Sequence, residues 1–105
     1  MKRRATDPAE HQPQTALAIL AQAIASLRDP GCVAAFLQDL CTPAELEAMT
    51  DRWRVVPLLL QGVPYREIHD RTSVSVTTIG RVARSLDHGA GGYAAAIERR
   101  ADCAE

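Results

Sequence analysis

The chain of 105 residues is long enough for one domain, and 47% of its residues are apolar, as in an ordinary globular protein. No stretch approaches the ~20 apolar residues that a membrane-spanning helix requires, and the basic start MKRRATDPAEHQPQ lacks the apolar segment of a signal peptide. Three cysteines with neither a CxxC pair nor a metal-ligand spacing to histidine indicate reduced thiols. We therefore expect a cytoplasmic protein with no metal site.

The charges are distributed unevenly, although the net charge of −1 by itself argues neither for nor against a nucleic-acid partner. Residues 7–51 contain seven acidic residues and one arginine, whereas residues 64–86 contain four arginines and two acidic residues. Eleven of the twelve basic residues are arginine, whose planar guanidinium suits phosphate groups and base edges. The later segment is therefore the candidate for contacting an anionic partner.

The first part of the chain predicts a flexible arm followed by two helices. Residues 1–13 contain two prolines and many polar residues, as is typical of a disordered arm. Over residues 15–27, apolar residues recur at helical spacing and form a stripe that is broad for a surface helix. Because so small a domain has few aromatic residues for its core, this stripe suggests an oligomer. The sequence RDPG then breaks the helix, and a second helix is expected over residues 30–40.

A capping pattern marks the start of the third predicted helix. Thr42 can serve as the N-cap, Pro43 suits the first helical position, and Glu45 completes a capping box. Apolar residues continue at helical spacing as far as residue 60. Pro57 lies inside this helix and is expected to kink it, and Gly62 is a natural stop.

The next segment raises a choice between strand and helix. The sequence VPYREIHDRT predicts a short helix, but the four residues from Val76 to Ile79 are all β-branched, as is common in strands. No other segment could pair with such a strand, and single strands are not stable. We therefore predict a helix over residues 75–86, and with it a helix-turn-helix over about residues 64–86.

The end of the chain predicts one further helix. The glycine-rich sequence HGAGGY forms a break, and a last short helix follows over residues 92–100. The sequence thus predicts an all-α domain over residues 14–100, with a flexible tail at 101–105.

The predicted helix-turn-helix divides into a core face and an outward face. Ser75 can cap the second helix. The core positions are Ile68, Ile79, Val82 and Leu86. The outward positions carry groups that can contact bases or phosphates: Val76, Thr77, Gly80, Arg81 and, one turn later, Arg84. The pattern alone also allows a helical hairpin with a solvated arginine face.

The stretch LCTPAELEAMTDRWRVVPLLLQGVPYREIHDRTSVSVTTIGRVARSL resembles the Trp repressor superfamily, and more closely its YerC/YecD-type branch. Several separate motifs occur in the same order and spacing, among them TPAELEA, YREI and TTIGRVARSL, and HGAGGY is also similar. The resemblance covers about residues 33–98. It implies an all-α, Trp-repressor-like homodimer in which the first helices of the two subunits interlock.

The resemblance also implies where DNA would bind. The expected contacts are Arg66 and His69 in the first helix of the motif, and Ser75, Val76, Thr77, Thr78, Gly80 and Arg81 in the turn and second helix. A symmetric dimer would recognise a roughly palindromic site with half-sites about one DNA turn apart. Two positions depart from the family: Gly80 stands where relatives usually carry threonine, and Ser73 replaces a turn glycine.

A small-molecule effector is a separate question. Arg52 and Arg81 correspond to the two arginines that clamp the indole in the tryptophan-responsive member, and Thr42 and Ser85 also match pocket positions. Val82, however, stands where that member has a glycine close to the ligand, and crowding a packed site commonly costs ~1–3 kcal/mol. We therefore expect that tryptophan is not the effector and that the arginines serve ion pairs or phosphate contacts.

No pattern in the sequence indicates an enzyme. There is no Ser/His/Asp arrangement, and HGAGGY lacks the lysine and hydroxyl residue of a phosphate-binding loop. We predict a dimeric transcriptional regulator, a repressor, that binds double-stranded DNA and needs no cofactor. The alternative is a dimer of the same fold that has lost specific DNA binding and docks another protein.

Overall fold

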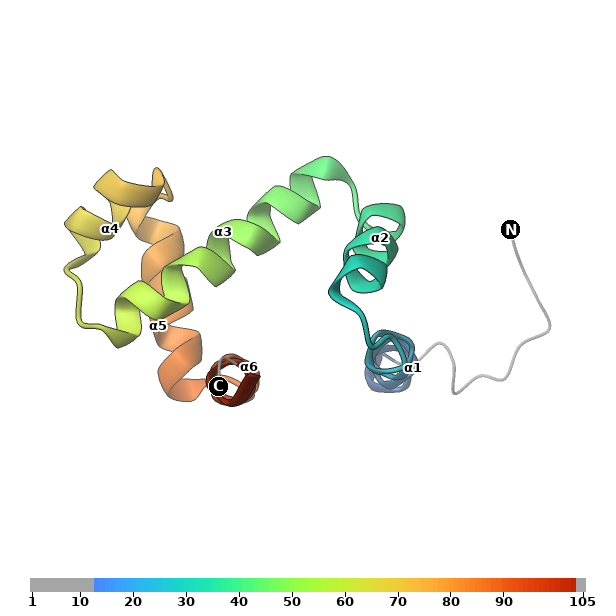
Figure 1. Ribbon diagram of the computed structural model, residues 1–105. Helices are drawn as coiled ribbons and strands as arrows, with labels where there is room; N and C mark the ends of the chain where they lie inside the picture. The colour runs from blue at the N-terminus through green and yellow to red at the C-terminus, as the bar shows by residue number, and fades with distance from the viewer. Residues whose placement is uncertain (1–12, 104–105) are drawn as a thin grey trace. The chain divides into compact units, whose positions relative to one another are not determined.

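The computed structural model describes residues 13–103 and forms six helices, with no strand among the described residues (Figure 1). The helices in chain order are α1 (Pro13–Ala25), α2 (Pro30–Leu40), α3 (Pro43–Leu60), α4 (Tyr65–Thr72), α5 (Val76–His88) and α6 (Gly92–Cys103). The predicted all-α class is confirmed. The chain divides into two compact units between Thr42 and Pro43, and each is described by itself.

The first unit contains α1 and α2, separated by the predicted RDPG break. Asp29 caps α2, because its carboxylate accepts a hydrogen bond of 3.1 Å from the Cys32 amide. Neither helix has a buried residue in the single chain. Leu17 and Ile19 of α1 are 65% and 49% exposed. The apolar stripe predicted to be buried is therefore open within one copy of the chain.

The long helix α3 opens the second unit. It begins at Pro43, as predicted, and continues through Pro57 to Leu60. The chain then turns at Gly62, whose φ of 79° is the left-handed conformation that glycine adopts without strain. The amide of Val63 bonds back to the Leu58 carbonyl at 3.1 Å, so the end of α3 is closed by a defined turn.

The core of the second unit lies among α3, α4 and α5, which pack against one another (Figure 1). It consists of six buried residues: Val55, Val56, Ile68, Val74, Ile79 and Val82. The predicted core roles of three of them, one in α4 and two in α5, are thus confirmed, and Leu86 packs half-buried against the cluster. The helix-turn-helix is held by its own inner face and by the second half of α3.

The last helix packs against α5 beyond a glycine-rich break. Gly91 has a φ of 88°, which turns the chain between the two helices. Tyr93 of α6 stacks on Trp53 of α3, with ring centroids 6.4 Å apart, and joins α6 to the core. The helix continues to Cys103, past the predicted end at residue 100. The predicted arm and tail otherwise lie outside the described residues.

Candidate nucleic-acid interface

A three-residue turn joins the two short helices of the second unit. Ser73 has φ 66° and ψ 6°, a left-handed conformation that is uncommon for a residue with a side chain. Its amide donates to the His69 carbonyl at 2.8 Å. The Thr72 hydroxyl donates to the Ile68 carbonyl at 2.7 Å and accepts from the Val74 amide at 3.1 Å. The backbone groups of the turn thereby find partners while the Val74 side chain enters the core.

Two side chains from outside the turn also hold it. The imidazole Nδ1 of His69 bonds to the Val74 carbonyl at 2.8 Å, and the ring nitrogen must be the donor because a carbonyl only accepts. From α3, Arg54 donates to the Thr72 carbonyl at 3.1 Å and pairs with Asp51 at 3.4 Å. The sequence gives no sign of the Arg54 contact, because eighteen residues separate its partners along the chain.

Ser75 caps α5, as predicted from the sequence. Its hydroxyl oxygen accepts from the Thr78 amide at 3.1 Å, and the hydroxyl donates to the Thr78 side-chain oxygen at 3.0 Å. Two of the residues expected to contact DNA therefore bond to each other. Their first role in the structure is to start the helix.

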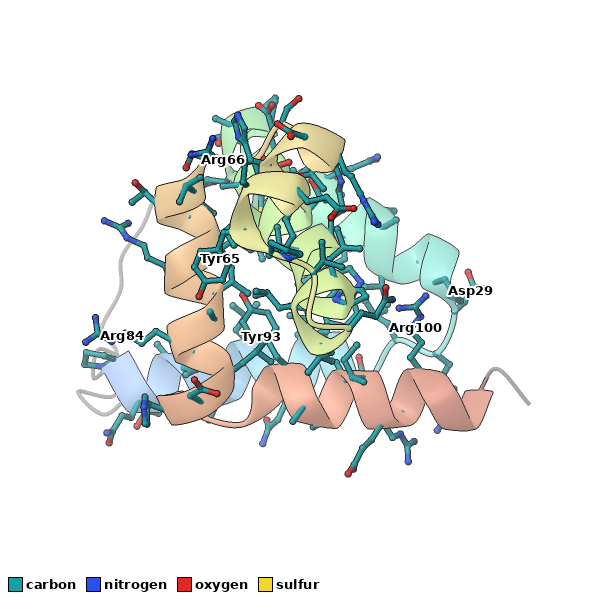
Figure 2. All side chains as sticks on the ribbon, turned by 90° about the vertical axis from the view of Figure 1, so that its left-hand side faces the viewer. Asp29, Tyr65, Arg66, Arg84, Tyr93 and Arg100 are labelled. Atoms are coloured by element: carbon teal, nitrogen blue, oxygen red, sulfur yellow. The ribbon has the colours of Figure 1, made fainter. Side chains whose placement is uncertain are left out.

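The division of α5 into two faces is sharp. Ile79 and Val82 are buried, at 0% and 1% exposure, whereas Val76 at the start of the helix is 51% exposed. Thr77, Arg81 and Arg84 are also exposed. Figure 2 shows Arg84 pointing outward from α5, away from α3 and α4, and Tyr65 of α4 lying beside α5.

A shallow hollow of about 490 Å³ runs along this outer face. Its lining includes the Tyr65 ring of α4 and, from α5, Thr77, Gly80, Arg81 and Arg84. The structure thus brings most of the predicted α5 contacts to one surface, which we call the α5 outer face (Val76, Thr77, Gly80, Arg81 and Arg84).

The two predicted contacts in α4 lie near this surface but differ in kind. Arg66 is exposed and makes no ion pair or hydrogen bond within residues 13–103 (Figure 2). His69 uses one ring nitrogen for the turn, as described above. Arg71 pairs with Glu67 on the surface of α4, with 2.5 Å between the charged groups.

The residues proposed for an effector pocket are not gathered in the second unit. Arg81 lines the hollow along α5, whereas Ser85 lines a different one beside Tyr93. Val82 fills the core instead of leaving room beside Arg81. Thr42 belongs to the first unit, so the predicted pocket of Thr42, Arg52, Arg81 and Ser85 stays a prediction.

Two other kinds of site were searched for in residues 13–103. These residues contain no cluster of three histidine, cysteine or acidic side chains placed to hold a metal ion. None of the helices described in this part of the chain combines the length and the apolar character needed to cross a bilayer.

Comparisons with known proteins agree with this geometry. Residues 15–101 match the family described as Trp repressor protein. The chain is 36% identical over 80 residues to the protein YerC of Bacillus subtilis (strain 168), which covers 76% of this chain and 77% of that protein.

Two crystal structures are also similar. One is a TrpR-like protein from Eubacterium eligens ATCC 27750, with a TM-score of 0.76 and 33% identity over 90% of this chain and 96% of the other. The second is a candidate Trp repressor from Staphylococcus aureus, with a TM-score of 0.77 and 32% identity over 90% and 95% of the two chains.

The left-handed turn residue generates a prediction about stability. Ser73→Gly should raise the free energy of unfolding by roughly 0.5–1 kcal/mol, because glycine adopts this φ without the penalty of a Cβ. Urea unfolding at fixed protein concentration, followed by the fluorescence of Trp53, measures the change. Ser73→Ala keeps the Cβ and should bring no gain, so equal stabilisation by both variants would contradict this explanation.

The hydrogen bond between His69 and Val74 generates a second prediction. His69→Ala should lower the free energy of unfolding by about 1 kcal/mol, because the Val74 carbonyl loses a partly buried partner. Arg66→Ala is the matched control on the same helix and should stay within about 0.5 kcal/mol of the parent chain. Equal losses in the two variants, measured by urea unfolding, would show that the imidazole does not hold the turn.

Proposed function

The chain belongs to the Trp repressor family, and from this premise we propose that it is a transcriptional repressor that binds a palindromic operator as a homodimer. The helix-turn-helix of α4 and α5 is the proposed DNA-binding unit. A cytoplasmic location goes with this function, since the DNA of a bacterial relative lies there.

The observation that carries the proposal is the two-sided character of α5. Its inner face is anchored by Ile79 and Val82, so the opposite face is held in a fixed direction. That face presents a valine, a threonine hydroxyl and two guanidinium groups. These groups suit a thymine methyl, a base edge or phosphate, and guanine or phosphate, respectively. The N-terminal part of such a helix is what enters the major groove.

The second helix of the motif would read the bases, and the first would set its position. Arg66 on α4 is exposed and has no ion-pair partner within the described chain, so it is available for a backbone phosphate. His69 is proposed to act mainly through the turn, with its remaining ring nitrogen available to DNA. Phosphate contacts of this kind fix the register of a protein on the duplex without reading its sequence.

The apolar surface of the first unit supports a homodimer. Leu17, Ile19 and Leu40 are 65%, 49% and 51% exposed in the single chain. Complete burial of a leucine or isoleucine is worth ~1.5–3 kcal/mol, so three such residues give a strong tendency to associate. We propose that a second copy of the chain covers them. Two copies related by a two-fold axis would present two α5 helices to a palindromic site.

Tryptophan is not assigned as an effector in this proposal. The buried Val82 side chain is part of the core that holds α5, so it could not move aside for an indole without disturbing that helix. Whether another small molecule controls the protein is left open by the described residues.

The proposed role of the outer face yields a prediction for binding. Arg81→Ala should weaken binding to a sequence enriched from a random DNA pool by roughly 10- to 100-fold, since a good arginine–base pair is worth ~1–3 kcal/mol. Fluorescence anisotropy with labelled DNA at one salt concentration measures the affinity. Arg99→Ala removes the same charge from α6 and should have a small effect. Equal losses, or unchanged binding by Arg81→Ala, would favour the protein-docking alternative.

The proposed dimer yields a prediction for the oligomeric state. Leu17→Lys places a charge in the exposed apolar stripe of α1 and should shift the protein from dimer to monomer in sedimentation equilibrium. Gln22→Lys adds the same charge on the other side of α1 and should leave the dimer intact. A Leu17→Lys protein that remains a stable dimer would contradict the assignment of α1 to the interface.

A further inference from the structure

Gly80 has no explanation within the chain itself. It lies in the middle of α5 with an ordinary helical backbone, because the only positive-φ glycines among the described residues are Gly62 and Gly91. A Cβ built at position 80 would meet no atom within 4 Å. Neither the backbone conformation nor packing therefore requires glycine there, although glycine is among the poorest residues for a helix interior.

The surroundings of Gly80 are rich in hydrogen-bond donors. The glycine forms part of the shallow hollow along α5, beside Thr77, Arg81 and Arg84 of the same helix and the Tyr65 side chain of α4. Both guanidinium groups lack an ion pair within residues 13–103. The donors of the hollow are thus gathered around the one position on its floor that has no side chain.

The acidic group of the hollow lies at its other end. Asp87 and His88 also line it, but they are seven and eight residues further along α5. At a rise of 1.5 Å per residue, they stand roughly 10–12 Å from Gly80 along the helix axis. The donors nearest to Gly80 therefore favour a compact anion with several oxygen acceptors.

We propose that the gap at Gly80 seats one backbone phosphate of the operator in each half-site, a proposal that rests on the proposed DNA-binding function. The missing side chain lets the phosphate approach the helix backbone closely, as glycine commonly permits for a ligand. Arg81 and Arg84 then donate to the phosphate oxygens from the sides, with the hydroxyl groups of Thr77 and Tyr65 available as further donors. Gly80 is thus a positioning residue that sets how deeply α5 enters the groove.

A methyl group at position 80 tests this proposal. Gly80→Ala should raise the melting temperature by a few degrees, because alanine is the better helix residue and the added methyl lies in open space. The same change should weaken operator binding by roughly tenfold or more, because the methyl occupies the place of the phosphate. A gain in stability with a loss of binding is a pair of effects that a general structural defect would not produce.

Gly92→Ala is the matched control. Gly92 begins α6, its φ is not positive, and an added Cβ also meets nothing within 4 Å. This variant should bind DNA as tightly as the parent chain. If Gly80→Ala binds the enriched operator as tightly as Gly92→Ala, the gap is not used and the inference is overturned.

Neutral methylphosphonate groups, placed one at a time along the operator, identify the seated phosphate. The parent chain should lose affinity at one particular phosphate in each half-site, and Gly80→Ala should lose little more there. If the two proteins respond alike at every phosphate, the gap serves something other than a phosphate and the assignment is wrong. If the parent chain enriches no DNA sequence at all, the proposed function fails, and this inference fails with it.

Discussion

The direction in which α5 leaves α4 depends on one turn, and the rest of the candidate site depends on that direction. Ser73 must hold a left-handed conformation for the chain to reverse, and the His69 imidazole and the Thr72 hydroxyl bond to the backbone of the next residue. Val74 then enters the core, and Ile79 and Val82 follow it from the next helix. Because α5 is anchored along its inner face, its outer face points outward as a rigid surface. Such rigidity lowers the entropic cost of binding a groove.

The start of α5 shows a conflict between helix stability and surface chemistry. β-branched residues and glycine are poor helix formers, yet Val76, Thr77 and Gly80 occupy its first half. The structure offsets part of this cost through the mutual hydrogen bonds of Ser75 and Thr78 and through the buried side chains between them and the middle of the helix. Local rules tend to be broken at functional positions, and the broken rules here gather on the one face that the core does not use.

Local features of the sequence predicted much of the fold, and features that depend on distant residues escaped it. Pro43, Gly62 and the cap at Ser75 mark helix ends through chemistry that acts within a few residues, so these boundaries were predictable. The four β-branched residues after Ser75 looked like a strand, and only the lack of a pairing partner favoured a helix. The contact from Arg54 to the turn joins segments with no common sequence pattern. The apolar stripe of α1 was correctly expected in a helix, but periodicity cannot distinguish burial within a chain from burial against a second copy.

The most direct test of the central claim is an NMR titration of the ¹⁵N-labelled full chain with an enriched DNA duplex. The account predicts that the largest amide shift changes occur from Ser75 to Arg84 and in the first turn of α4, with small changes at the far end of α6. Shift changes centred on α6 or on the first unit, with α5 unaffected, would contradict the assignment of the helix-turn-helix as the DNA-binding surface.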